Sequence, residues 1–92
     1  MISPRRALWE RALARSQQEL EAQIRRVRVP ASTQERHRLA AAEHARDRVV
    51  FDAFEQGRLS AIDIAAALGT RVREARRIIE KVGLTAQAGD RS

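Results

Sequence analysis

The sequence has few or none of several residue types that often indicate a particular fold or functional site. Its 92 residues include no cysteine and no tyrosine, two prolines, four glycines and one tryptophan. Without cysteine the chain has neither a disulfide framework nor a thiolate zinc site. No apolar run approaches the roughly 18 residues of a membrane-spanning helix, and the basic first residues are not followed by the apolar core of a signal peptide. We therefore expect a cytoplasmic protein that does not bind membranes.

Motifs of catalysis are missing as well. The sequence has no glycine-rich phosphate loop and no nucleophile with a base at a useful spacing. His37 and His44 are seven residues apart, with Glu43 and Asp47 nearby. A metal site would need a third ligand of matching geometry, so we interpret both histidines as surface residues. We expect no enzyme, no metal and no cofactor, and nothing indicates a small-molecule effector.

What the chain does have is charge of one sign. Its formal net charge is +6, carried by 17 arginines and one lysine. A basic surplus favours polyanionic partners, nucleic acid first, which would place the protein at the nucleoid. The chain also holds 17 alanines, however, and joint enrichment in alanine and arginine follows from codon choice in a GC-rich genome. The positions of the arginines are therefore more informative than their number.

The apolar pattern predicts an all-α fold that begins with a long helix. No repeat and no strand-like alternation appears, and the start signal is Ser3 followed by Pro4. The helix runs to about residue 27, and apolar residues recur along it every three, four or seven positions. This narrow stripe consists of Trp9, Leu13, Leu20, Ile24 and Val27.

A second helix is predicted to follow the break at Val29-Pro30. Ser32 and Glu35 have the spacing of a capping box, in which each side chain satisfies a backbone amide of the other. The helix should continue to about Gln56, and Gly57 is a natural stop.

The third and fourth helices are predicted to form a tight pair. Ser60 and Asp63 repeat the capping signal for a helix over about 61–68, and Gly69 permits a turn that needs positive φ. The fourth helix should open at Thr70 or Arg71 and end at Gly83, and the following residues, 85–92, should be a flexible tail.

The spacing within these two helices carries a resemblance to a known family. Two sets of apolar residues face each other across Gly69, and small alanines at 65 and 75 permit a close crossing. The sets are Ile64, Ala65 and Leu68, then Ala75, Ile78 and Ile79. With the preceding helix, this pattern resembles the helix-turn-helix of small homeodomain-like DNA-binding proteins of bacteria and phages, of the resolvase and sigma-factor type. It departs from them at Thr70-Arg71, where the usual cap is replaced.

The resemblance implies sequence-specific binding of double-stranded DNA, as in a transcriptional regulator, with a recognition helix at about 71–82 in the major groove. Residues of the fourth helix that do not pack against the other helices would face the DNA. With the preceding turn, the predicted DNA-binding set is Arg58, Arg71, Val72, Arg73, Arg76, Arg77 and Glu80. Arg58 and Arg71 would mainly contact phosphates, and Arg46 and Arg48 are further phosphate candidates.

The helix-turn-helix domain would span 32–84, which leaves the N-terminal helix, within 1–31, for another role. Its apolar stripe must be buried, either by folding back on the second helix or by pairing with another chain in a coiled-coil-like homodimer. We expect the homodimer, because two recognition helices read a two-fold site better than one. Two alternatives stay open: an architectural or recombination accessory DNA-binding protein, and a helical protein-interaction module that does not bind DNA.

Overall fold

The computed structural model describes residues 4–27 and 29–90, except for the side chains of 86–90. It confirms the all-α prediction. The helices are α1 (Pro4–Arg26), α2 (Thr33–Glu55), α3 (Ala61–Leu68) and α4 (Val72–Asp90). None of the described helices is long and apolar enough to cross a membrane.

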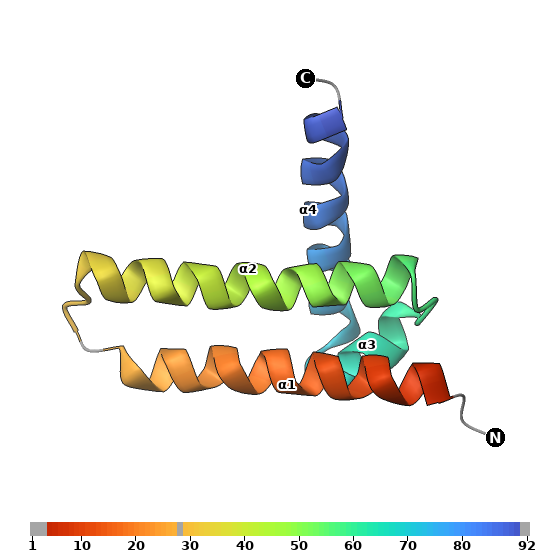
Figure 1. The fold of residues 1–92 in the computed structure, drawn as a ribbon, viewed down its shortest axis with the longest axis horizontal. Coiled ribbons are helices and arrows are strands. Elements are labelled where there is room, and N and C mark those ends of the chain that lie inside the picture. The colour runs from red at the N-terminus through yellow and green to blue at the C-terminus, as the bar shows by residue number, and fades with distance from the viewer. Residues whose placement is uncertain (1–3, 28, 91–92) are drawn as a thin grey trace.

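The long helices α1 and α2 form an antiparallel hairpin, and α3 and α4 complete the molecule at one side of it (Figure 1). The short α3 lies against the first half of α1. Helix α4 crosses α2 steeply, and its C-terminal half extends away from the hairpin (Figure 1). This projection explains why the radius of gyration, 14.2 Å, exceeds the about 12 Å expected of a compact chain of this length.

The apolar stripe of α1 is buried within the chain. Leu13 and Leu20 face α2 and are 0% and 5% exposed, so the fold-back alternative is the one that the structure adopts. The stripe is incomplete at its C-terminal end, because Ile24 remains 53% exposed. The predicted cap Ser3 lies outside the described residues, and Pro4 is the first residue of α1.

Helix α2 begins as predicted and ends within one residue of the predicted Gln56, but the turn after it differs. The Oγ of Ser32 accepts a hydrogen bond from the Glu35 amide at 3.1 Å. The helix ends at Glu55, and the residue that takes a left-handed conformation in the following turn is Arg58, with φ 55°, rather than Gly57. The glycine is needed for another reason: a Cβ at position 57 would lie 2.6 Å from the indole of Trp9.

Both ends of α3 match the sequence prediction. The Ser60 Oγ accepts from the Asp63 amide, and the Asp63 carboxylate accepts from the Ser60 amide, which completes the capping box. Gly69 has φ 74°, and the amides of Gly69 and Thr70 donate to the carbonyls of Ala66 and Ala65. This Schellman arrangement ends α3 and turns the chain, so that α4 begins after only three intervening residues.

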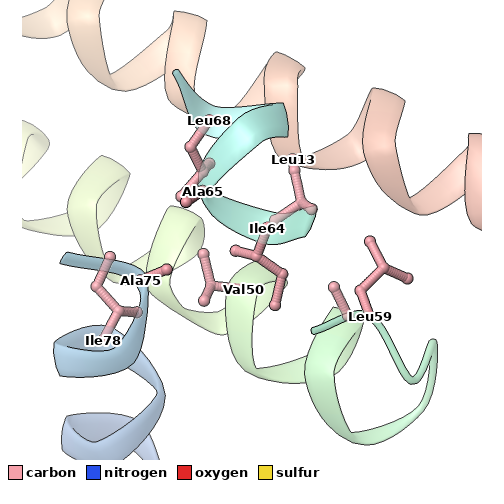
Figure 2. Packing of buried hydrophobic residues seen from close by; sticks show 9 residues of the cluster. Leu13, Val50, Leu59, Ile64, Ala65, Leu68, Ala75 and Ile78 are labelled. Atoms are coloured by element: carbon pink, nitrogen blue, oxygen red, sulfur yellow. The ribbon is translucent and has the colours of Figure 1, made fainter. Parts of the chain in front are cut away.

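The core lies where all four helices meet (Figure 2). Ile64 of α3 and Ile78 of α4 are fully buried, and Leu13 of α1 and Val50 of α2 close the cluster from the hairpin side. Ala65 and Ala75 are also buried, at 2% and 0% exposure, as the close crossing of α3 and α4 requires. The N-terminal helix therefore shares one core with the predicted helix-turn-helix.

The predicted end of α4 at Gly83 is wrong. The helix continues through Gly83 to Asp90, into the segment that we expected to be a flexible tail. Gly83 does not adopt positive φ, and a Cβ there would lie 3.6 Å from the ring of Phe51. The glycine thus sits in the helix interior opposite α2 and does not terminate the helix.

Candidate nucleic-acid interface

The candidate interface is the face of α4 that points away from the core. Ala75, Ile78 and Val82 pack inward. Four members of the predicted DNA-binding set point elsewhere: Arg73, Arg76, Arg77 and Glu80. At 100° per residue these polar side chains fall within an arc of about 100°, opposite the packed side. Arg73, Arg76, Arg77 and Glu80 are all exposed, as the prediction requires.

The first turn of α4 fixes the register of this face. The carbonyl of Arg71 accepts hydrogen bonds from the amides of Glu74 and Ala75, at 3.0 and 3.3 Å, so Arg71 is the N-cap residue and Val72 begins the helix. The arginine side chain has no acceptor and cannot cap the helix. Arg71 is exposed, and Val72 is partly buried against the core, which leaves only part of its side chain for an outside contact.

The three arginines of the α4 face are not equivalent. Arg77 donates from Nε and Nη2 to the two carboxylate oxygens of Glu74, at 3.1 and 2.5 Å. The hydrogen bond from Arg77 lowers the pKa of Glu74, and the same bond raises the pKa of Arg77. Arg73 and Arg76 have no acidic partner among the residues that the structure describes. These two side chains are therefore ready to bind an outside acceptor, whereas Arg77 must first leave its pair.

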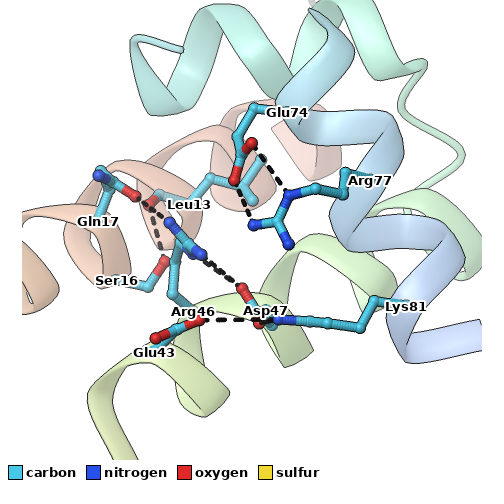
Figure 3. A network of polar contacts seen from close by, with 9 residues as sticks. All are labelled: Leu13, Ser16, Gln17, Glu43, Arg46, Asp47, Glu74, Arg77 and Lys81. Atoms are coloured by element: carbon cyan, nitrogen blue, oxygen red, sulfur yellow. Dashed lines mark hydrogen bonds and ion pairs between the residues drawn. The ribbon is translucent and has the colours of Figure 1, made fainter. Parts of the chain in front are cut away.

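A charge network connects α4 with the α1–α2 hairpin (Figure 3). The Arg46 guanidinium contacts Asp47 Oδ1 at 2.7 Å and Gln17 Oε1 of α1 at 3.2 Å. From α4, Lys81 Nζ contacts Asp47 Oδ2 at 2.5 Å. The network therefore joins α1, α2 and α4.

This network corrects the prediction that Arg46 contacts phosphate. Its side chain is 8% exposed and its charge is matched by Asp47, which is 4% exposed. The sequence interpretation missed this role, since nothing in the local pattern distinguishes a buried Arg-Asp pair from an exposed one. The available signal was helical spacing, because Arg46 and Asp47 stand four and three positions before the apolar Val50 and so share its side of α2.

The remaining sequence candidates lie on the surface. Arg48 is 58% exposed and pairs with Asp52 at 3.6 Å, and Arg58 is exposed in the turn before α3. His37 and His44 are exposed on α2. Within the described residues, no three histidine, aspartate or glutamate side chains are grouped to hold a metal ion.

Comparisons with known proteins add nothing to this geometry. No model of a known protein family matches the sequence, and comparisons with curated proteins and with solved structures find no match.

Proposed function

We propose that the protein binds double-stranded DNA in a sequence-specific way, as a homodimeric transcriptional regulator whose α4 enters the major groove. The observation that carries this proposal is the exposed arginine face of α4, which directly follows the Gly69 turn and is backed by a core that all four helices share. An exposed, rigidly supported basic helix is what groove insertion requires.

The chemistry of the face suits guanine. An arginine fork can donate to O6 and N7 of one guanine at once, and such a pair discriminates against other bases by about 1–3 kcal/mol. Arg73 and Arg76 have no acidic partner among the described residues that would have to be displaced first. Arg71 and Arg58 would contact phosphates, which position the protein and carry no sequence information.

Arg76 provides a direct test. After selection of a bound duplex from random DNA at physiological salt, we expect Arg76→Lys to reduce discrimination between the selected site and a scrambled duplex by about ten-fold, because lysine keeps the charge and loses the fork. The slope of affinity against salt should stay unchanged, since the number of neutralised phosphates is the same.

Arg11→Ala is the matched control, because Arg11 is an exposed arginine of α1 outside the α4 face. Its discrimination should equal that of the wild type. If the wild type and Arg76→Lys discriminated equally between the selected site and the scrambled duplex, Arg76 would not contact bases. A complete lack of duplex affinity in the wild type would favour the protein-interaction module instead.

A further inference from the structure

A second basic feature lies at the far end of α3 from the arginine face. A concave pocket of about 320 Å³ is formed where the first turns of α1 meet the turn between α2 and α3. Its ionisable lining residues are Arg5 and Arg6 of α1, Arg58 of the turn and Asp63 of α3. Trp9, the one tryptophan of the chain, forms part of the wall.

Two of the three arginines that line the pocket have no acidic partner among the described residues. Arg6 is occupied, because it contacts Asp63 Oδ1 at 2.6 Å and Glu10 Oε1 at 3.1 Å. Asp63 is in turn held by Ser60, whose hydrogen bond lowers the pKa of the Asp63 carboxyl. Arg5 and Arg58 have no acidic partner in the part of the chain that the structure describes. The pocket is therefore lined by two arginines without an acidic partner among the described residues.

The pocket is held in shape by its own packing. The indole of Trp9 occupies the space that a Cβ at Gly57 would need, so α1 and the turn are in close contact. The turn itself is fixed by hydrogen bonds from the Gly57 and Leu59 amides to the carbonyls of Asp52 and Ala53, at 3.2 and 3.1 Å. Within it Arg58 has φ 55°, a conformation that costs a non-glycine residue about 1 kcal/mol or more. The fold thus maintains an unfavourable backbone conformation at one of the two unpaired arginines.

We infer that this pocket binds a phosphate of the DNA backbone, with Arg5 and Arg58 as its ligands. The inference rests on the proposed function and extends it by making α1 part of the DNA-binding surface. Helix α3 separates the pocket from the start of α4, and its eight residues span about 12 Å. This length is close to the about 12 Å width of the major groove. The pocket and the start of α4 are therefore about one groove width apart, which allows a single duplex to contact both.

Trp9 allows a local measurement. We expect its fluorescence to change when the full-length protein binds a short duplex, because the DNA backbone would lie against the wall that the indole forms. The same titration with inorganic phosphate and with pyrophosphate tests the other source of this ligand chemistry. We expect no saturable change with either at millimolar concentration, since a free anion lacks the contacts made by α4.

Two variants test the ligands. Arg5→Ala and Arg58→Gly should each lower duplex affinity about five-fold near 0.15 M salt and reduce the salt slope by about one, as expected for one lost phosphate contact. Arg58→Gly is chosen because glycine accepts positive φ, so the loss of charge is not confounded by loss of stability. Arg58→Lys keeps the positive charge, so it should retain most of the slope of duplex affinity against salt. Arg11→Ala removes one arginine from α1 outside the pocket and is the control.

The outcomes separate this inference from the proposed function. Duplex binding that requires Arg76 but is the same for Arg5→Ala, Arg58→Gly and Arg11→Ala would overturn the inference and leave the function intact. A Trp9 response to phosphate or pyrophosphate without duplex affinity would assign the pocket to a free anion and contradict both. A smaller salt slope of duplex affinity in Arg5→Ala and Arg58→Gly, but not in Arg11→Ala, would support the inference if Trp9 fluorescence also changes only with the duplex.

Discussion

At the scale of single residues, the glycines show how the same residue type can serve different needs. Gly69 is required for its backbone, because it has φ 74° while a Cβ there would meet nothing within 4 Å beyond its chain neighbours. Gly57 is required for space, because the Trp9 indole and the Ala53 carbonyl would lie 2.6 and 2.8 Å from a Cβ. Gly83 is required for neither, since its nearest neighbour would be at an ordinary 3.6 Å.

These differences predict opposite effects of the same substitution. Gly57→Ala should lower the free energy of unfolding by about 1–3 kcal/mol, because it overpacks the contact with Trp9. Gly83→Ala should raise it by about 0.5–1 kcal/mol, since alanine is favoured over glycine in a helix interior. Chemical denaturation followed by circular dichroism measures both. A stabilising Gly57→Ala would mean that the close approach of α1 to the turn does not exist.

At the scale of the elements, a charge network links α2 to α4 beside the apolar core. Asp47 lies between Arg46 of the same helix and Lys81 of α4, and it is almost completely buried. Lys81 is 42% exposed, so water can replace its partner, but Arg46 has no such access. Loss of Asp47, which leaves Arg46 without its partner, should therefore reduce stability more than loss of Lys81.

We expect Asp47→Ala to lower the free energy of unfolding by about 3–5 kcal/mol, because it leaves the Arg46 charge buried without its partner. Lys81→Ala should cost about 1 kcal/mol or less, as for other partly exposed ion pairs. Urea denaturation of the two variants gives the comparison. Equal and small effects would contradict the buried position of Arg46. The double variant Asp47→Ala with Arg46→Met should recover much of the loss.

At the scale of the whole molecule, the hairpin of α1 and α2 leaves less of the α1 stripe exposed for the expected homodimer. The stripe of α1 is already covered by α2, so only its uncovered end remains for a second chain. Ile24 is 53% exposed there, about 28 Å along the helix from Arg5, so a dimer contact at Ile24 leaves the proposed phosphate pocket open.

We therefore propose that two copies associate through the C-terminal end of α1. Sedimentation equilibrium at micromolar concentration should show a dimer, and Ile24→Glu should shift it to a monomer because the charge would be buried at the contact. Gln18→Glu, an exposed change elsewhere on α1, should remain dimeric. A monomeric wild type would exclude the homodimer and leave α4 to read a site as a single copy.

Much of this molecule is readable from local sequence signals. Pro4, Ser32, Ser60 with Asp63, and Gly69 mark helix ends through interactions that span at most four residues, and each is found where it was expected. The exposed face of α4 follows in the same way from the spacing of Ala75 and Ile78. The all-α fold and the candidate reading face thus depend on short-range hydrogen bonding and helical periodicity.

Only the tertiary structure decided which charges are available and where the helices meet. Arg46 and Arg73 look alike in the sequence, yet one is buried against Asp47 and the other is exposed without an acidic partner among the described residues. Arg5 and Arg58 line one pocket although 53 positions separate them. The meeting of Arg5 with Arg58 depends on packing between distant segments, which no local periodicity encodes. The sequence by itself determined the number and order of the helices and the arginine face, whereas the fold determined the full length of α4 and which arginines lack an acidic partner.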